Sequence, residues 1–260
     1  MKSTTFPSLF ISHGAPNIVL QNTQSNKNIN SFSKTLKKPK YIIIFSSHYL
    51  TKDLKIINYT TKDLMYDFYG FERELYEYKY DISSNKDISL KVFNHLKENG
   101  INVSIDALRT SFDHGVWTCL ALMYEKIDIP IIQLSLPYSY SYEELIHLGE
   151  IIKELKDEAM IIGSGGITHN LRGISHSNEI KKYAKEFNEI VIKTIEEADE
   201  NSLINITKEK SFYQNHPSSE HFIPLYIIYG SAYNKKGISF NSEFMYSNIS
   251  MESFAFDKGN

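Results

Sequence analysis

Three apolar segments of this chain each lead into a short polar stretch that ends in histidine. Apolar runs of this length, bounded by turn-forming residues, predict buried strands. In an open parallel sheet, ligands bind beyond the carboxyl ends of the strands, so the three imidazoles are expected to meet in one crevice. The segments and their histidines are Ser8–Ser12 with His13, Tyr41–Phe45 with His48, and Met160–Ile162 with His169.

Glycines surround the third of these strand ends. Gly163, Gly165 and Gly166 lie between the apolar run and His169. Because glycine has no Cβ, these positions predict a tight backbone turn that a larger residue could not adopt.

Strands and helices are expected to alternate along the chain, with no internal repeat, low-complexity linker or domain seam. This pattern predicts a single α/β domain over residues 1–260, with a mostly parallel central sheet flanked by helices and a site at the carboxyl ends of its strands. Besides the three segments above, the expected strands are Lys55–Tyr59, Ile101–Ile105, Ile129–Leu136 and two within Phe240–Phe256. The expected helices are Ser31–Lys38, Leu90–Asn99, Leu120–Tyr124, Tyr142–Leu155, Glu179–Glu197 and one with His221 in its first turn and Ser218 or Ser219 as its cap.

Two further stretches are expected to be irregular. The polar residues Asn17–Ser31 predict a loop with at most one helical turn. The aromatic residues Asp67–Phe71, around Gly70, predict a loop that forms a wall or lid over the site.

Composition narrows the functional classes. The net charge of −3 offers no basic field for nucleic acid, and no apolar stretch approaches the ~18 residues that a membrane span needs. Cys119 is the only cysteine, which fits a reducing, cytoplasmic location, and too few apolar residues precede His13 for a secretory signal. The 18 tyrosines and 15 phenylalanines predict aromatic side chains that line a pocket or form contacts in a homo-oligomer.

The nine histidines differ in their surroundings. His95 and His147 lie among charged residues and are expected at the surface, and His176 and His216 are weaker candidates for a site. Five remain, namely His13, His48, His114, His169 and His221. They could simply cap turns. If they converge, three neutral imidazoles can hold a divalent transition metal while the others move protons.

Other catalytic signatures are missing from the sequence. HExxH, a phosphate-binding lysine loop, a dinucleotide-binding glycine fingerprint and G-x-S-x-G are all absent. A metal held by histidines is therefore the chemistry that the motifs favour.

Six motifs, in order along nearly the whole chain, resemble the class III extradiol ring-cleavage dioxygenases, specifically the 4,5-DOPA extradiol dioxygenase branch. The motifs are Ser12-His13-Gly14-Ala15-Pro16, Ser46-Ser47-His48-Tyr49, Asp67-Phe68-Tyr69-Gly70-Phe71, Phe112-Asp113-His114-Gly115-Val116-Trp117, Gly163-Ser164-Gly165 through His169-Asn170-Leu171, and Pro217 through Glu220-His221-Phe222-Ile223-Pro224-Leu225.

The resemblance implies an α/β catalytic domain with one divalent metal on His13, His48 and His221. It implies His169 as the acid/base near the metal, either as an acid/base alone or also as a fourth ligand, and His114 as a hydrogen-bonding group for substrate or oxygen. Family members use Fe(II) and O₂ to open the ring of a small catechol, and some are found with Zn(II).

One departure separates this chain from many relatives in the wider superfamily. They complete the metal set with a carboxylate, whereas His221 takes that place here, and Glu220 is expected to point elsewhere on a helix. Three neutral ligands also suit Zn(II), which does no redox chemistry. A zinc-bound hydrolase-type enzyme and a non-enzymatic binding module therefore stay as alternatives to the dioxygenase.

Overall fold

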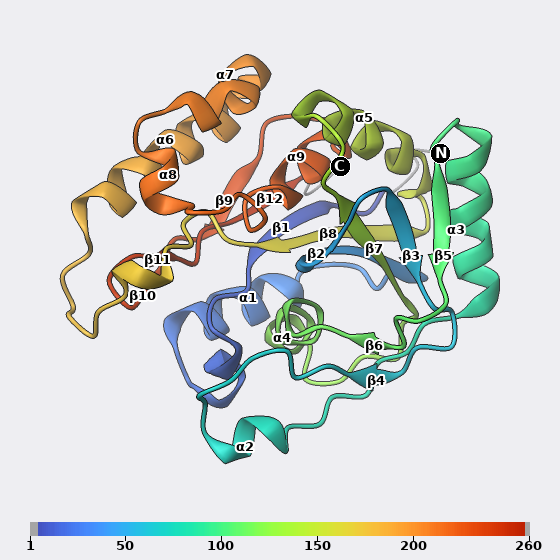
Figure 1. The fold of residues 1–260 in the computed structure, drawn as a ribbon, viewed down its shortest axis with the longest axis horizontal. Coiled ribbons are helices and arrows are strands. Elements are labelled where there is room, and N and C mark those ends of the chain that lie inside the picture. Colours follow the sequence, from blue (N-terminus) through green and yellow to red (C-terminus); the bar gives the residue numbers. More distant parts are fainter. Residues whose placement is uncertain (1–4, 258–260) are drawn as a thin grey trace.

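An eight-stranded mixed sheet forms the centre of the molecule in this computed structural model, which describes residues 5–257 (Figure 1). The spatial order is β5-β3-β7-β2-β8-β1-β12-β9, and the four central strands β7, β2, β8 and β1 are parallel. The strands are β1 Ser8–Ser12, β2 Tyr41–Thr51, β3 Leu54–Ile57, β5 Val103–Asp106, β7 Ile131–Pro137, β8 Ala159–Gly165, β9 Ile238–Asn241 and β12 Ser253–Phe256. The predicted α/β class with a mostly parallel central sheet is confirmed.

Helices cover both faces of this sheet. Figure 1 shows α1 and α4 on one side and α5 and α9 on the other. Every residue of β1, β7 and β8 is buried, as expected for strands covered on both faces, which have near-continuous apolar sequences. The helices are α1 Gln24–Ser33, α2 Arg73–Tyr76, α3 Lys86–Glu98, α4 His114–Met123, α5 Tyr142–Ile152, α6 Lys182–Glu197, α7 Glu200–Asn205, α8 Phe212–Asn215 and α9 Pro224–Gly230.

Short elements complete the described chain. Two small sheets pair β4 with β6 and β10 with β11, and four 3₁₀ turns join longer elements. Their bounds are β4 Asp63–Leu64, β6 Ser111–Phe112, β10 Phe244–Met245, β11 Ile249–Ser250, η1 Pro16–Leu20, η2 Lys153–Leu155, η3 Leu171–Gly173 and η4 Ile206–Lys208.

The first long helix lies earlier in the chain than predicted. Most of Asn17–Ser31 is helical, in η1 and α1, and α1 ends at Ser33, so the helix predicted over Ser31–Lys38 is wrong. The Thr23 side chain accepts a hydrogen bond from the amide of Asn26 and caps α1, while Ile29 and Phe32 are buried. The cap and these two buried apolar side chains, together with the Asn28–Asn241 and Asn30–Met123 hydrogen bonds, order a polar segment.

Several predicted boundaries are also wrong. β2 continues to Thr51, so His48 lies within this strand rather than beyond it, and its pairing with β7 is irregular between Phe45 and Leu50. Helix α4 begins at His114, earlier than the predicted start at Leu120. The C-terminal region contains four strands instead of two, because the backbone turns at Tyr246 and Ser247, both with positive φ.

The segment before α9 differs as well. His221 lies in a turn that precedes the helix, and α9 begins at Pro224. Neither Ser218 nor Ser219 caps α9 through its side chain. The backbone carbonyl of Ser219 instead accepts from the amides of Phe222 and Ile223, which closes the turn around His221.

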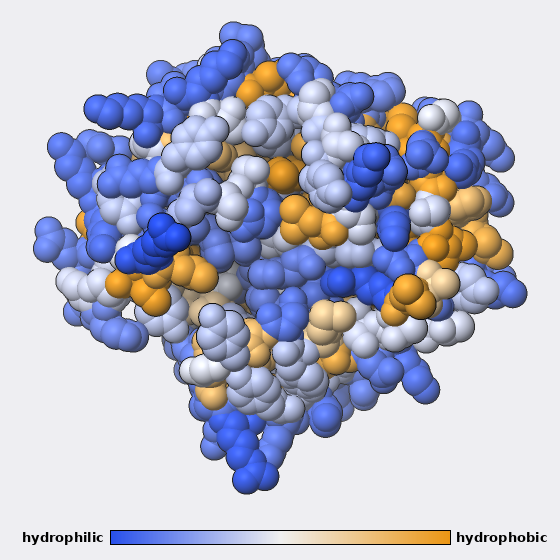
Figure 2. Space-filling model, viewed as in Figure 1, coloured by the Kyte–Doolittle hydropathy of each residue, from blue (hydrophilic) through white to orange (hydrophobic). Residues whose placement is uncertain are grey.

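Within residues 5–257, no helix combines the length and apolarity needed to cross a membrane. On the face drawn in Figure 2, hydrophobic residues lie in several separate groups divided by hydrophilic ones.

A buried ion pair ties the end of β12 to the turn before β8. Lys156 Nζ lies 2.5 Å from Asp257 Oδ2, and the side chains are 0% and 3% exposed. Burial lowers the pKa of Lys156, while the charge of Asp257 acts in the opposite direction. The Asp257 carboxylate also accepts from the amides of Tyr233 and Asn234.

Removing the charge of Asp257 is expected to destabilise the fold. Asp257→Asn leaves the buried Lys156 ammonium without its charged partner and keeps only one of the two oxygens that accept from the Tyr233 and Asn234 amides, which together costs about 3 kcal/mol in the free energy of unfolding. Urea denaturation measures this loss. The matched control is Asp128→Asn in the exposed Lys38–Asp128 pair, where the midpoint is expected to stay unchanged. Equal midpoints for both variants would contradict the assignment of the buried pair as a stabilising contact.

Candidate metal centre

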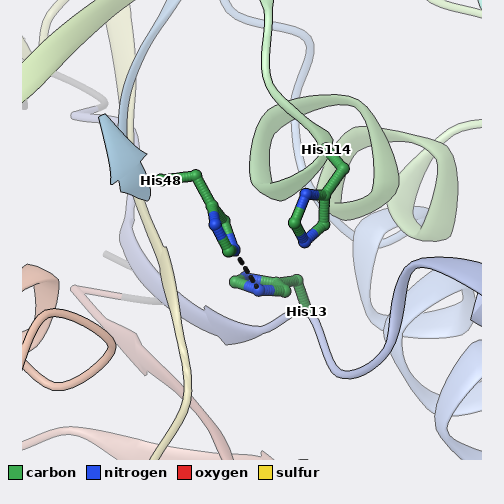
Figure 3. A group of neighbouring side chains, drawn as sticks. All are labelled: His13, His48 and His114. Carbon is green, nitrogen blue, oxygen red and sulfur yellow. Dashed lines mark hydrogen bonds between the residues drawn. The ribbon is translucent and has the colours of Figure 1, made fainter. Parts of the chain in front are cut away.

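Five histidines from separate segments meet at the carboxyl ends of β1, β2 and β8. Figure 3 shows His13, His48 and His114 directed toward one another from β1, β2 and the start of α4. His13 Nε2 lies 3.3 Å from His48 Nε2, and the ring centroids of His48 and His114 are 3.9 Å apart. The centroid of the His221 ring lies 5.4 Å from that of His13 and 5.0 Å from that of His48. It lies 3.4 Å from the centroid of His169, on which it stacks. The expected convergence of the strand-end histidines is confirmed.

Glycines permit this close approach, but not by turning the chain. Gly163, Gly165 and Gly166 all lack positive φ, and the first two lie within β8, so the predicted tight turn is wrong. A Cβ on Gly165 would lie 2.2 Å from the carbonyl oxygen of His221, and the amide of Gly166 donates to that oxygen at 2.9 Å. The segment that carries His221 therefore lies directly against the β8 backbone.

A second glycine brings α4 against β2. A Cβ on Gly115 would lie 2.3 Å from Ser46 Oγ and 3.0 Å from a ring carbon of His48. Glycine at this position lets the first turn of α4, and with it His114, lie beside His48.

Ser164 fixes the tautomer of His13. The Ser164 hydroxyl donates its single hydrogen to the carbonyl of Gly115 at 2.6 Å. It can therefore only accept from His13 Nδ1, which lies 2.9 Å away. With the hydrogen on Nδ1, the lone pair of His13 is on Nε2, the atom that faces His48.

Asp67 orients His114 in the same way. Its Oδ1 accepts from both the ring Nδ1 and the backbone amide of His114, at 2.9 and 3.0 Å. Burial alone would raise the pKa of Asp67, but the hydrogen bond and charge of His114 hold it at about 2. Asp67 is thus a carboxylate, and it directs Nε2 of His114 into the cluster.

The loop that contains Asp67 forms part of the wall of the site. The Phe68 ring meets the His114 ring edge to face at 5.5 Å. Tyr69 is 92% exposed and points away. The expected wall is therefore made by Asp67 and Phe68.

Glu220 contacts His221, contrary to the prediction that it points elsewhere on a helix. Its Oε1 lies 3.2 Å from His221 Nδ1. The two residues lie in a turn, where neighbouring side chains can meet. His221 Nε2 is buried, and within the described residues it has no hydrogen-bond partner.

Four of the five cluster histidines are neutral at ordinary pH. Burial, followed by the neighbouring histidines, lowers the pKa of His48 to about 4 and of His169 to about 3, and it lowers those of His13 and His221 well below the usual value. Neutral imidazole is the form that binds metal ions.

Four histidines stay outside the cluster. His147 and His176 are exposed. His95 is half-buried and donates from Nε2 to the carbonyl of Ile151, so the surface location predicted for it is wrong. His216 is fully buried and donates from Nε2 to the carbonyl of Ile167 at 2.7 Å, which gives it a structural contact behind His169.

These residues fit a divalent transition metal. Two nitrogens bound to one ion at about 2.1 Å, with an angle of 90–110°, lie about 3.0–3.4 Å apart, and the pair from His13 and His48 is 3.3 Å apart. The buried Nε2 of His221 has no hydrogen-bond partner within residues 5–257, so it is a further nitrogen available to bind a metal ion. Two groups have ligand atoms mutually within 4.8 Å, namely His13 with His48 and His114, and His169 with Glu220 and His221. The predicted set of His13, His48 and His221 draws on both groups and stays a prediction.

Sequence reasoning did not single out Ser164, Asp67 or Glu220 as site residues. Each binds the outer nitrogen of a cluster histidine, and all three lie within the motifs that carry the resemblance. The motifs were therefore the available signal, because the contacts of Ser164 and Asp67 join residues 151 and 47 positions apart.

Comparisons with known proteins agree with this geometry. Residues 5–256 match the family described as the catalytic LigB subunit of aromatic ring-opening dioxygenase. The chain is 30% identical over 237 residues to a 4,5-DOPA dioxygenase extradiol of Escherichia coli K12, covering 89% of this chain and 87% of the relative. It is 32% identical over 230 residues to a 4,5-DOPA dioxygenase extradiol of Beta vulgaris, covering 86% and 85%.

The fold has a solved counterpart. The crystal structure of an uncharacterized protein from Escherichia coli K12 superimposes with a TM-score of 0.80 at 24% identity, covering 96% of this chain and 99% of that one. With the match over residues 5–256 and the two curated relatives, the chain belongs to the LigB family of class III extradiol ring-opening dioxygenases.

Proposed function

We propose that this chain is a metal-dependent dioxygenase that opens the ring of a small catechol with O₂ by extradiol cleavage. The cluster of buried neutral imidazoles, with a partnerless Nε2 on His221, is the observation that carries the proposal. Family membership and the names of the curated relatives support it.

His13, His48 and His221 are the proposed metal ligands. Ser164 leaves the lone pair of His13 on Nε2, and Glu220, which binds Nδ1 of His221, does the same for that ring. Both Nε2 atoms are thus prepared to bind a cation. Fe(II) at this position would bring catechol and O₂ together and let electrons pass between them, whereas Zn(II) would occupy the same ligands without redox chemistry.

His169 and His114 are the proposed proton-handling residues. His169 stacks on His221, so it lies beside the proposed ligands, and as a neutral imidazole it can take a proton from a catechol hydroxyl and return it later. Asp67 binds Nδ1 of His114, so Nε2 is the atom that faces the cluster. It can therefore hold a substrate hydroxyl in place, and Asp67 stabilises any positive charge that develops on the ring.

Two further expectations stay predictions of the sequence. Cys119 is buried and unpaired, which suits the predicted cytoplasmic location. Self-association into a homo-oligomer rests on the aromatic composition alone.

Anaerobic loading with Fe(II), followed by addition of catechols and O₂, tests the function. We expect O₂ uptake together with a yellow ring-opened semialdehyde, because extradiol cleavage incorporates both oxygen atoms into the opened ring. His169→Gln is expected to keep the metal and lower the rate by about 10²–10⁴-fold. Metal-loaded protein that consumes no O₂ with any catechol would contradict the proposal.

Comparison of His221→Ala with His114→Ala tests the ligand set. Loss of a direct ligand is expected to abolish metal binding in His221→Ala, whereas His114→Ala is expected to retain stoichiometric metal. Metal content after dialysis measures metal binding in both variants. His147→Ala, at an exposed histidine outside the cluster, is the matched control. The reverse result, with metal lost only in His114→Ala, would assign the third ligand to His114.

Ser164→Ala tests the role of the hydroxyl that orients His13. Without it, His13 loses the contact that fixes its tautomer, and metal affinity is expected to fall about 10–100-fold. Competition with a metallochromic chelator measures the affinity. Ser8→Ala removes another buried hydroxyl, at the opposite end of β1, and is expected to leave the affinity unchanged. Equal affinities for the two variants would overturn the assigned role.

A further inference from the structure

The stretch that follows β8 lies beside the stretch that leads into His221. Residues 166–170 carry His169, and residues 214–221 end at the ring on which His169 stacks. The contact between the proposed acid/base and a proposed metal ligand therefore depends on how these two stretches are joined. Within the described residues, four hydrogen bonds join them, namely the amide of Gly166 to the carbonyl of His221 at 2.9 Å, Nε2 of His216 to the carbonyl of Ile167 at 2.7 Å, the amide of His169 to the carbonyl of Asn215 at 2.8 Å, and Nδ2 of Asn170 to the carbonyl of Gln214 at 2.6 Å.

Two of these four bonds use a side chain, and they differ in burial. Asn170 is half-buried, so water can replace its contact, whereas His216 and Ile167 are both 0% exposed. Without the hydrogen on Nε2 of His216, the carbonyl of Ile167 would lose this donor in a place that water does not reach, which is costly for a buried carbonyl. The contact of His216 is therefore the stronger of the two.

His216 owes its place to this hydrogen bond rather than to its bulk. A carbonyl can only accept, so the ring hydrogen is on Nε2, and burial lowers the pKa of His216 to about 4, so the ring is neutral. Its Nδ1 is buried without a hydrogen-bond partner within residues 5–257. The rings around it are aromatic, namely Phe187, Phe212 and Phe222, with centroids at 5.9, 5.1 and 5.4 Å. A phenylalanine would suit these surroundings and bury no unpaired nitrogen, so the Nε2 contact is what distinguishes histidine from an apolar ring here.

The backbone that carries His216 is itself anchored. The amide of His216 donates to the carbonyl of Phe212 at the end of α8, at 2.7 Å. The Nδ2 of Asn215 donates to the carbonyls of Ser211 and Tyr183, at 2.9 and 3.3 Å, which ties α8 to α6. The donor thus lies on a fixed element, as a group that positions another residue requires.

We propose that His216 is a positioning residue that holds His169 against the ring of His221 by binding the carbonyl of Ile167. The proposal rests on the catechol chemistry proposed above. His169 lies two residues beyond this carbonyl, so His216 acts on it through the backbone. The carbonyl of His221 is bound separately, by the amide of Gly166. Loss of the His216 contact is therefore expected to release His169 rather than the metal ligand.

Hydrogen exchange of the Zn(II)-loaded chain, followed by mass spectrometry, tests the contact independently of turnover. His216→Phe keeps a ring among the aromatic neighbours but removes the donor. We expect the amides of residues 166–170 to exchange about 10-fold faster in this variant than in the unchanged protein. In His216→Gln, the terminal amide reaches approximately the position of Nε2 and can donate to Ile167, so protection is expected to return.

Steady-state kinetics of the Fe(II)-loaded chain test the effect on the reaction. In His216→Phe we expect kcat to fall about 10–100-fold, because a displaced acid/base transfers protons poorly. KM for the catechol and one bound metal per chain are expected to stay unchanged, and His216→Gln is expected to regain most of kcat. His95→Phe is the matched control, since the His95 ring also donates from Nε2 to a backbone carbonyl, that of Ile151 at 2.9 Å, but lies outside the cluster. Its kcat is expected to equal that of the unchanged protein.

The outcomes separate the two proposals. If the unchanged Fe(II)-loaded protein consumes no O₂ with any catechol, the proposed function fails, while the exchange rates still show whether His216 holds the segment. Unchanged exchange in His216→Phe overturns the contact as a constraint on residues 166–170. Faster exchange with an unchanged kcat, or a kcat that His216→Gln does not regain, overturns the positioning role. Loss of bound metal in His216→Phe also overturns it, because the effect would then fall on His221. If His216→Phe does not fold, His216→Asn, whose amide is too short to reach Ile167, takes its place in the same comparisons.

Discussion

The parallel pairing of β8 with both β1 and β2 is the constraint from which the site follows. Ser12 pairs with Gly165 and Ser46 pairs with Ser164, so the ends of three strands lie in one row. His13 follows β1 directly, and Ser164 lies within reach of its ring. A shift of one residue in the pairing register of β8 would turn every side chain of this strand to the other face of the sheet. Ser164 would then no longer reach His13.

Electrostatics give the cluster its chemical character. Protonation of His13, His48, His169 and His221 would bury several positive charges close together, so these four rings are stable in their neutral form. Two carboxylates supply the balancing charge nearby. Asp67 binds His114 and Glu220 binds His221, whereas the charge of fully buried Asp113 is paired with Arg109. A divalent cation among neutral ligands would thus find negative charge in the surrounding layer rather than in direct contact.

The central strands and the converging histidines could be predicted because their signals are local. A run such as Ile131–Leu136 is buried on both faces and therefore apolar throughout. Helix α1 could not be predicted, since it is held by contacts with distant residues, such as Phe32 on Phe240 and Asn28 on Asn241. The extension of β2 was missed because Ser46, Ser47 and His48 are polar.

The details of the site were harder to predict for a related reason. A sequence shows that Ser164 and Glu220 are present, but not which imidazole nitrogen each one binds. The glycines of β8 show this limit clearly. Three glycines so close together predicted a tight turn of the backbone. Gly165 instead allows the carbonyl of His221 to pack directly against β8.

Strand β1 pairs with β8, about 150 positions away, and with β12, which ends at Phe256. Ser12 Oγ also donates to the carbonyl of Glu252, so the last strand supports the one that carries His13. During synthesis from the N-terminus, the contacts that support His13 therefore form only after β12 has been made. Assembly of the centre is consequently a late event relative to the synthesis of β1, and an ion can be captured only after translation has passed His221 and β12.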